Sequence, residues 1–483
     1  MPNPRILITG ATGYVGRRLK EAFLKDNPTA IRLMVRNKNK ISPAVRERVE
    51  IVEGDTFDPV SLDRALRGID VAYYLIHSMG KGSDFESRDR ISAENFREAC
   101  IRQGVGRIIY LGGLGAKATA SRHLLSRMET GEILSQKEKQ VEAIWFRAGI
   151  IIGAGSASFE IIRNLIQKLP VMITPRWVNT LTQPVAIDDV IRYLMAGANL
   201  VHTGNLMVDI GTEAMNFKEM MIRGAAVMGL KRHLIPVPVL TPSLSSYWLI
   251  FFTPIPLAMA SALVEGLKSE TILLNNHAEK FFPDIIPMGF DQCVSEAVKE
   301  MEHDQIISRW CDSSGGNQCD LTEEDFPRGP ILRDRKVFYT QSLSRDQVFD
   351  SVCSLGGDAG WFAYNLLWQL RGAMDKFMGG YGLNRGRRLK RELRVGDAVD
   401  FWKVADIKPG KRLLFLAQMK VPGKAWLEFD IREDRLIQTA HFHPRGLWGR
   451  AYWFAMLPFH IFIFKALGEK ILEHAATLPP VSE

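Results

Sequence analysis

The sequence predicts a doubly wound, parallel α/β domain followed by an α+β domain in which an antiparallel sheet joins a long C-terminal helix. Three observations predict this arrangement. Short apolar runs alternate with amphipathic helical segments through residues 5–152, which is the pattern of βαβ units. A glycine-rich turn separates the first apolar run from the first helix. After residue 330 the pattern changes to strands separated by turns.

The elements of the first domain follow one another in a regular order. We expect helices over residues 14–24, over 88–103 and through Glu132, because apolar positions recur there at helical spacing. Short apolar runs bounded by turns are typical of buried parallel strands. Such runs predict strands at residues 5–10, 31–35, 49–52, 70–76, 107–111 and 143–152.

The alternation loosens after Ser156, and residues 156–300 are expected to form a substrate-side extension with helices that close the first domain. A single core stops growing at roughly 250–300 residues. A chain of 483 residues therefore needs at least two domains. Turn-forming residues at 312–318, followed by two prolines, mark a boundary. We expect a first domain over residues 1–310, a linker over 311–330 and a second domain over 331–483.

The second domain is expected to hold an antiparallel sheet and one closing helix. The predicted strands cover residues 336–341, 391–395, 398–404, 412–421, 425–431 and 436–443. Two apolar stretches invite comparison with membrane spans. Tyr452–Phe464 is shorter than the ~20 residues that span a bilayer, and Tyr247–Val264 is interrupted by prolines. We expect both to be buried or interfacial helices.

The composition excludes a disordered or a fibrous protein. Hydrophobic residues make up 46% of the chain and charged residues 24%, which is the balance of a folded globular protein. The five cysteines have no close metal spacing, so we expect a reducing compartment and no metal site. Met1 leads directly into a strand, and we therefore expect a cytoplasmic protein without a signal peptide.

The net charge of +8 raises the question of an anionic partner. A basic run extends from Arg385 to Arg394. It is either a solvated helix face or a contact with anionic lipid headgroups at the inner face of a membrane. Nucleic acid is not expected, because the run lacks any helix-turn-helix, zinc-finger or RNA-binding pattern.

The glycine-rich turn predicts a dinucleotide site of the Rossmann type. Gly10 permits a tight turn, Gly13 lets the backbone approach a pyrophosphate, and Gly16 lets helix and strand pack closely. The free N–H groups and positive dipole end of the following helix favour phosphate binding. The residues expected to contact the cofactor here are Gly10, Thr12, Gly13, Tyr14, Val15 and Gly16.

The end of the second strand predicts which dinucleotide binds. NAD sites carry an acidic residue there, which holds the ribose hydroxyls. This chain has Arg36 instead, and a guanidinium suits the 2′-phosphate of NADP(H). We therefore expect NADP(H) in preference to NAD(H). Asp55, after the third strand, either accepts a hydrogen bond from the adenine amino group or forms a turn.

Four motifs together resemble the extended and atypical short-chain dehydrogenase/reductases, and most closely their NmrA-like and complex I accessory-subunit-like groups. The motifs are Gly10–Gly16, Gly54–Asp55, Tyr74–Gly80 and Phe146–Gly153. The resemblance covers roughly residues 1–230. It implies a Rossmann fold, a nicotinamide cofactor and, in active members, a catalytic set of Ser, Tyr and Lys.

The sequence departs from that catalytic set at each position. Gly112, Gly113 and Leu114 stand where the Ser is expected. The segment His123–Arg127 is the best match to the Tyr-x-x-x-Lys pattern. Arg127 can bind the nicotinamide ribose but cannot deprotonate at working pH. His123 is either a proton donor or an exposed helix residue.

His77 and Ser78 follow the fourth strand, at the edge of a doubly wound sheet that faces the ligand. They either contact the nicotinamide side of the cofactor or are simply polar residues at a strand end. The second domain, over residues 331–475, resembles an uncharacterised bacterial domain and, more distantly, the START/Bet v 1 helix-grip fold, which implies lipid binding.

Taken together, these features predict an NADP(H)-dependent reductase of a hydrophobic carbonyl or enone, with a small apolar substrate and peripheral membrane contact. The alternative is a non-catalytic NADP(H)-binding redox sensor or a scaffold for a membrane complex.

Overall fold

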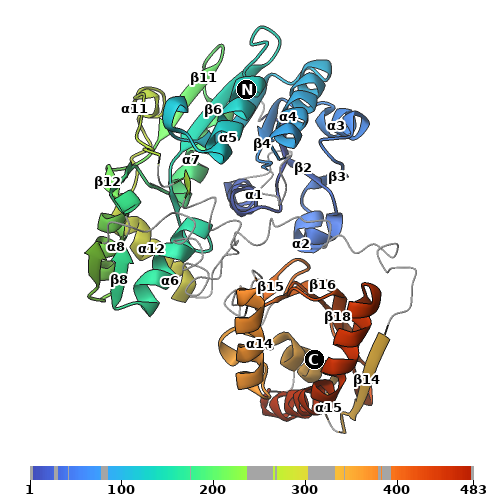
Figure 1. Ribbon diagram of the computed structural model, residues 1–483. Coiled ribbons are helices and arrows are strands. Elements are labelled where there is room, and N and C mark those ends of the chain that lie inside the picture. The colour runs from blue at the N-terminus through green and yellow to red at the C-terminus, as the bar shows by residue number, and fades with distance from the viewer. Residues whose placement is uncertain are drawn as a thin grey trace. The chain divides into compact units, whose positions relative to one another are not determined.

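The computed structural model describes residues 4–26, 31–41, 43–77, 85–174, 176–236, 265–266, 269–302, 332–341, 343–378, 382 and 393–479. These residues fall into two compact units, one within residues 4–302 and one within 332–479 (Figure 1). The expected linker 311–330 and the apolar stretch 247–264 lie outside the described residues.

The first unit is built on a seven-stranded parallel sheet in the order β11-β6-β5-β4-β1-β2-β3. Every pairing in it is parallel; Ile8, for example, lies opposite Leu33 on one side and Tyr73 on the other. The order reverses between β1 and β4, as in doubly wound folds, and confirms the predicted fold class. The strands are β1 (Ile6–Ile8), β2 (Ile31–Val35), β3 (Glu50–Glu53), β4 (Val71–Tyr74), β5 (Arg107–Gly113), β6 (Glu142–Ala148) and β11 (Leu206–Ile210).

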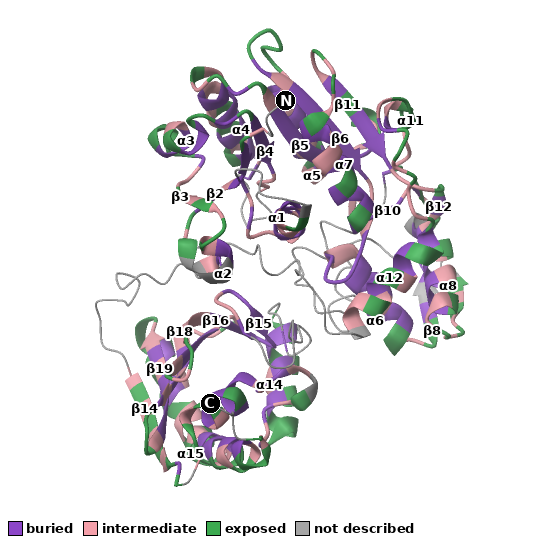
Figure 2. Ribbon diagram, turned by 180° about the vertical axis from the view of Figure 1, so that it is seen from behind, coloured by how far each residue is buried: buried purple, intermediate pink, exposed green. Residues whose placement is uncertain are grey.

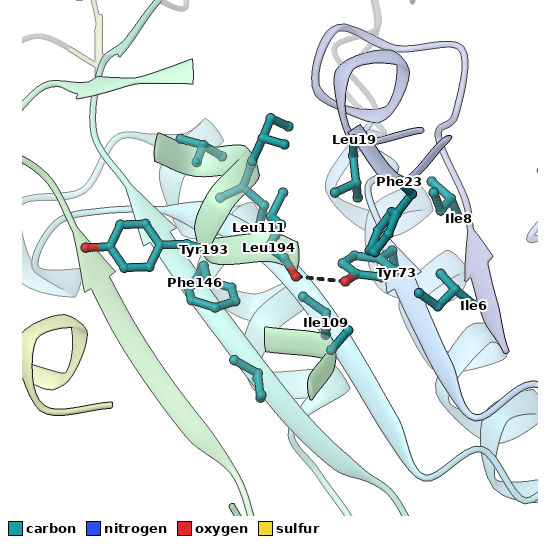
Figure 3. Packing of buried hydrophobic residues seen from close by; sticks show 14 of the residues in the cluster. Ile6, Ile8, Leu19, Phe23, Tyr73, Ile109, Leu111, Phe146, Tyr193 and Leu194 are labelled. Carbon is teal, nitrogen blue, oxygen red and sulfur yellow. Dashed lines mark hydrogen bonds between the residues drawn. The ribbon is translucent and has the colours of Figure 1, made fainter. Parts of the chain in front are cut away.

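Helices cover both faces of this sheet. Alternate side chains of β1 point to opposite faces: Ile6 and Ile8 belong to one buried cluster and Leu7 to another. The first cluster is covered by α1 (Tyr14–Asp26) and α7 (Ile187–Asn199), where the Tyr73 hydroxyl donates to the Leu194 carbonyl at 2.7 Å (Figure 3). The second is covered by α3 (Pro59–Leu66), α4 (Phe85–Arg102) and α5 (Arg122–Leu134).

The rest of the first unit consists of shorter elements. Two-stranded pairings join β7 (Ile151–Ile152) to β10 (Val185–Ala186), β8 (Val171–Thr174) to β13 (His233–Pro236), and β9 (Leu181–Thr182) to β12 (Met215–Asn216). The remaining helices are α2 (Pro43–Arg46), α6 (Ala157–Lys168), α8 (Phe217–Val227), α11 (His277–Phe281) and α12 (Phe290–Glu302).

The second unit has a six-stranded antiparallel sheet in the order β14-β19-β18-β17-β16-β15, which Figure 1 shows as curved. Its last helix, α15 (Gly446–Thr477), packs on β14 and β19, and this arrangement confirms the predicted antiparallel sheet with a C-terminal helix. The strands are β14 (Leu332–Tyr339), β15 (Ala398–Val399), β16 (Trp402–Lys408), β17 (Arg412–Ala417), β18 (Gly423–Ile431) and β19 (Arg435–Pro444).

Three details of the second unit differ from expectation. Two further helices, α13 (Arg345–Cys353) and α14 (Asn365–Phe377), were not predicted. The strand expected over 391–395 is wrong where it is described, because residues 393–395 form no strand. The strand expected over 398–404 is a hairpin, since the backbone reverses at Asp400, whose φ is +53°.

Helix α15 is longer than its predicted apolar segment. It has 32 residues and is, among the described residues, the one helix long and apolar enough to cross a membrane. One face packs in the core, through residues such as Phe464, Leu467 and Ile471. Spanning a bilayer would remove that face from the sheet. Its other face, green in Figure 2, exposes Trp448 at 84% and Phe462 at 66%.

Candidate functional site

The glycine-rich turn lies between β1 and α1, and its geometry requires glycine. The Gly13 N–H donates to the Gly10 carbonyl at 2.8 Å and closes the turn. Gly10 has a φ of +67°, and a Cβ there would overlap with the carbonyl oxygen of Leu75. A Cβ on Gly16 would overlap with the Gly10 carbonyl. Both glycines are therefore needed for the close approach of strand and helix.

The first turn of α1 is suited to a phosphate. Thr12 and Gly13 precede the helix, and Tyr14, Val15 and Gly16 form its first turn. The N–H groups of a first helical turn have no acceptor within the helix, and this turn contains no acidic residue that would repel an anion. The Tyr14 hydroxyl packs toward Gly153, and burial raises its pKa above the ordinary value. Tyr14 therefore stays un-ionised.

Arg36 follows directly after β2 and is exposed. Because its side chain is exposed, the guanidinium is accessible to a ligand. Glu53 lies opposite Val35 on β3, but its carboxylate accepts the Lys38 N–H at 2.9 Å. Arg36 therefore presents a positive charge at the end of β2, beside the negative charge of Glu53 at the end of β3.

Asp55 forms a turn. Its carboxylate accepts the Phe57 N–H at 3.1 Å, and its own N–H donates to the Ser61 hydroxyl at 3.1 Å. The turn-forming interpretation is therefore present in the structure. The contact with adenine stays a prediction.

His77 is paired with a buried carboxylate that the sequence did not reveal. Its Nδ1 lies 3.2 Å from Oδ2 of Asp89 on α4, and Asp89 is only 4% exposed. The Ser126 hydroxyl of α5 donates to the same oxygen at 3.1 Å. Burial lowers the pKa of His77, and the bond to Asp89 opposes that effect. Ser78, the other residue expected here, lies outside the described residues.

A signal for Asp89 was present in the sequence. Phe85, Asp89 and Phe96 share the buried face of α4, so Asp89 is an acidic residue on an apolar stripe. A carboxylate in that position needs a partner, because unpaired buried charge is costly. The partner could not be chosen without the tertiary structure.

The structure places His123 and Arg127 near His77, since the charges of both act on the His77 imidazole. The His123 ring stacks on Phe85, with ring centroids 4.6 Å apart. The Arg127 guanidinium donates to the Leu111 carbonyl at 3.2 Å. Its Nε is buried and has no hydrogen-bond partner among the described residues. These side chains therefore gather beyond the carboxyl ends of β4 and β5.

The position of the missing Ser is closed by neighbouring side chains. A Cβ on Gly112 would overlap with the indole nitrogen of Trp145, and a Cβ on Gly131 would overlap with the same indole ring. A Cβ on Gly113 would meet Leu124 at 2.5 Å. A serine does not fit at 112 or 113 unless these neighbours move. Burial also raises the pKa of the nearby Tyr110 to about 12, and its hydroxyl donates to the Arg127 carbonyl at 2.9 Å.

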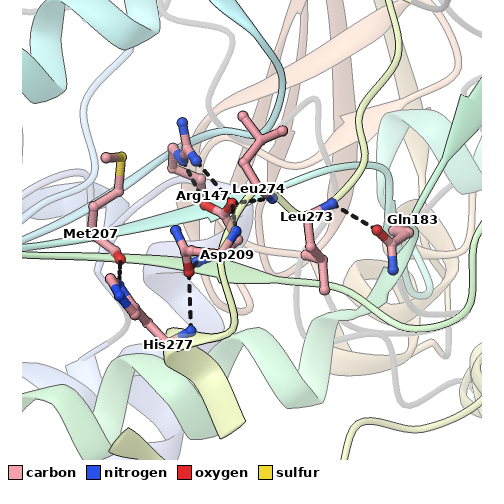
Figure 4. Close-up of polar contacts among 8 residues, drawn as sticks. Arg147, Gln183, Met207, Asp209, Leu273, Leu274 and His277 are labelled. Atoms are coloured by element: carbon pink, nitrogen blue, oxygen red, sulfur yellow. Dashed lines mark hydrogen bonds and ion pairs between the residues drawn. The ribbon is translucent and has the colours of Figure 1, made fainter. Parts of the chain in front are cut away.

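A buried ion pair fixes the far side of the same sheet edge (Figure 4). Arg147 at the end of β6 donates to both carboxylate oxygens of Asp209 on β11, at 2.6 and 2.8 Å. Asp209 also accepts the N–H groups of Leu274 and Asn275, at 2.7 and 3.2 Å. Gln183 accepts the Leu273 N–H at 2.7 Å. The segment that precedes α11 is thereby held against the strand ends.

Two family models match separate parts of the chain. A family described as NAD(P)H-binding matches residues 10–146, and a family described as a protein of unknown function, DUF2867, matches residues 327–467. The first match covers the glycine-rich turn and the sheet edge described above. The first unit is an NAD(P)H-binding Rossmann domain, and the expected cofactor class is confirmed. The resemblance of the second domain to the helix-grip fold stays a prediction.

Two curated relatives are named as reductases. A ceramide reductase of Caulobacter vibrioides is 27% identical over 239 residues, which are 48% of this chain and 73% of that protein. A (4-alkanoyl-5-oxo-2,5-dihydrofuran-3-yl)methyl phosphate reductase of Streptomyces griseus is 24% identical over 232 residues, 46% of this chain and 74% of that protein.

Solved structures support the fold. The triphenylmethane reductase of Citrobacter sp. has a TM-score of 0.50 and 20% identity, covering 61% of this chain and 99% of that chain. At this identity the likeness shows a shared fold alone. The first unit accordingly shares the fold of that protein.

Proposed function

We propose that the protein is an NADPH-dependent reductase of a carbonyl or enone on an apolar, lipid-like molecule. The observation that carries this proposal is the His77–Asp89 pair at the carboxyl edge of the sheet. Strand order reverses between β1 and β4, and ligands of doubly wound sheets bind outside the strand ends at that reversal. The glycine-rich turn follows β1 and His77 follows β4, so the two features flank one binding position.

The reaction needs a hydride and a proton. NADPH, when bound, would supply the hydride to the electrophilic carbon, which is the carbonyl carbon of a ketone or the β-carbon of an enone. We assign the proton on the oxygen to His77. Asp89 accepts the Nδ1–H and holds the ring, so Nε2 carries a proton to donate toward the substrate only in the imidazolium form. Because burial lowers the pKa of His77, the population of this proton-donating form rises as the pH falls, and turnover should rise with it. The buried carboxylate stabilises the imidazolium, and solvent returns the proton after each turnover.

Arg127 is assigned a positioning role. Its guanidinium stays charged at working pH, and its buried Nε has no partner among the described residues. It can therefore donate to the carbonyl oxygen of the substrate or to the nicotinamide ribose. The preference for NADPH over NADH is assigned to Arg36, which is exposed at the end of β2.

The apolar character of the proposed substrate draws support from exposed side chains in the second unit. Helix α14 exposes Leu366 at 76% and Phe377 at 85%, and α15 exposes Trp448 at 84%. Large apolar side chains exposed together mark surfaces that contact membranes or other partners. We assign these residues to peripheral contact with a lipid surface, and the name of the Caulobacter relative is consistent with a lipid substrate.

NADPH oxidation against a panel of long-chain ketones and enones tests the catalytic proposal. We expect turnover that falls at least a hundredfold in His77→Ala and in Asp89→Asn, with NADPH affinity retained. His202→Ala is the matched control, because Arg107 at the amino end of β5 donates to the His202 carbonyl, far from the proposed site. Loss of turnover in His123→Ala, but not in His77→Ala, would move the proton donor to His123.

A redox sensor is the second candidate, and the blocked Ser position at Gly112 favours it. Tight NADPH binding without turnover across the whole panel would support the sensor and overturn the reductase. For the lipid contact, co-sedimentation of the full chain with vesicles should be lost in Trp448→Ser. Ile286→Ser, which removes a side chain 78% exposed on the first unit, should sediment like the wild type.

A further inference from the structure

The interior of the second unit contains a polar side chain in an apolar setting. Alternate residues of β19, namely Leu436, Ala440 and Phe442, face the hydrophobic core. Gln438 lies between them on the same face and is 1% exposed. Neither its Nε2 nor its Oε1 has a hydrogen-bond partner within the described part of the chain. A buried primary amide without partners is unusual, because over nine-tenths of buried polar groups are paired.

Helix α15 covers this position. At one end the Trp453 ring stacks on Phe442, with centroids 5.7 Å apart and planes 9° apart. At the other end Gly468 abuts Phe338, because a Cβ on Gly468 would overlap with that ring. His460 is midway between these contacts, and its ring lies 5.1 Å from the Trp453 ring. The helix therefore places His460 over the middle of the β14–β19 pair.

A second set of polar groups meets His460 from β14. Lys336 pairs with Gln438 in register and Asp334 with Ala440, so their side chains face the same interior. The Lys336 ammonium donates to Oδ1 of Asp334 at 3.0 Å. The charges of both residues act on His460, and burial lowers the pKa of its imidazole to about 4. His460 is accordingly neutral near pH 7.

Further buried atoms in the same interior are also unpaired among the residues described. They are Oδ2 of Asp334, Nδ1 of His460 and Nε1 of Trp368, a residue of α14 whose ring lies 6.4 Å from that of Phe464. The Phe464 ring in turn lies 4.6 Å from the His460 ring. Each unpaired buried atom is destabilising, and their concentration in one interior calls for polar partners from outside the described residues.

We propose that this interior, between α15 and the β14–β19 pair, binds the polar head of an uncharged amphiphile carrying both a hydroxyl and an amide or ketone carbonyl. Gln438 offers two N–H donors on Nε2 and an acceptor on Oε1, Trp368 offers a donor, and Asp334 offers an acceptor. A head that pairs with all of them must both donate and accept. The Asp334–Lys336 pair has no net charge, so it selects against an ionic head. The surrounding aromatic rings suit a hydrocarbon chain.

This inference names a ligand class for the proposed reductase and therefore rests on the proposed function. Its test needs no turnover. The full-length protein is titrated with N-dodecanoylethanolamine, which is uncharged and carries a hydroxyl and an amide, and with dodecanoate, which has the same chain length and an anionic head. Calorimetry and tryptophan fluorescence report binding, and both probes are kept below their aggregation thresholds. We expect saturable binding of N-dodecanoylethanolamine, at least tenfold tighter than that of dodecanoate.

Two variants link binding to the polar cluster. Gln438→Leu should weaken N-dodecanoylethanolamine at least tenfold and raise the melting temperature of the ligand-free protein, because leucine removes two unpaired polar atoms. His460→Phe should also weaken the probe, and it serves if the first variant does not fold. Thr439→Val is the matched control: Thr439 is the next residue on β19, is 8% exposed and faces the opposite side. It should bind as the wild type does.

Each outcome tests the ligand site independently of the proposed reductase activity. If neither probe binds and Gln438→Leu only raises the melting temperature, ordered water satisfies the cluster and the ligand site is refuted. If dodecanoate binds as tightly as N-dodecanoylethanolamine, the assigned head chemistry is wrong. NADPH binding and oxidation measured on the same samples show whether the proposed reductase activity fails independently.

Discussion

The ion pair between Arg147 and Asp209 should be among the contacts of the first unit whose disruption, by removal of one partner, is most destabilising. Asp209 is 0% exposed and Arg147 7% exposed. Asp209→Ala would leave the guanidinium buried without its charge and the N–H groups of Leu274 and Asn275 without their acceptor. Breaking a buried pair by removing one partner costs about 3–5 kcal/mol. For a unit of this size that corresponds to a fall in melting temperature of roughly 6–20 °C.

Thermal unfolding in the presence and absence of NADPH measures this effect, because the transition that shifts with NADPH belongs to the first unit. The matched control is Glu296→Ala, which removes the partner of Lys299 in an exposed pair at 2.9 Å. Exposed pairs contribute about 0–1 kcal/mol. Replacing both buried partners, as Arg147→Met with Asp209→Leu, should recover much of the lost stability. A fall of less than 2 °C in Asp209→Ala would refute the reasoning.

Three further predictions concern the cofactor site and the second unit. Arg36→Asp should weaken NADPH roughly 10- to 100-fold by calorimetry, since a charge-assisted bond becomes a repulsion; a wild type that prefers NADH would contradict this. Gly13→Val should abolish binding of both dinucleotides while circular dichroism stays unchanged, because its side chain would occupy the pyrophosphate position; unchanged affinity would remove the site assignment. Because the pKa of His460 is about 4 in the folded state and higher when unfolded, the second unit should lose up to about 3 kcal/mol as pH falls from about 6.5 to 4. Urea unfolding at several pH values measures this loss. The charge of Asp334 reduces the loss and that of Lys336 increases it. An equal dependence of the unfolding free energy on pH in His460→Phe would contradict the prediction.

The parallel sheet was predictable where local pattern determines it. Strands such as β2 consist of consecutive apolar residues bounded by turns, and its observed bounds match the expected ones. Strand β11 was missed because Asp209 interrupts its apolar run, and only the distant Arg147 makes a buried carboxylate acceptable there. Helix α14 was missed for a different reason. It exposes Leu366 and Phe377, so polarity does not distinguish its buried face from its exposed face.

In the candidate site, too, the features set by local sequence could be predicted and those set by tertiary packing could not. The glycine-rich turn could be predicted because the constraints on Gly10 and Gly16 arise within a few residues of chain or from the adjacent strand. The His77–Asp89 pair could not, because it joins the end of a strand to a helix that follows an intervening segment. Sequence pattern marks a buried carboxylate as unusual, but the choice of its partner depends on how the helix packs on the sheet.

The packing around Trp145 restricts the order in which this sequence could change. Its indole fills the space that side chains at Gly112 and Gly131 would need. A serine introduced at position 112 alone would collide with the ring, whereas a smaller residue at 145 alone would open a void between β5 and α5. Positions 112, 131 and 145 are therefore coupled: the size of the side chain at each one limits the size that the other two can have. Introducing a serine at 112 would require a smaller residue at 145. With this tryptophan in place, a serine hydroxyl is not accommodated at position 112.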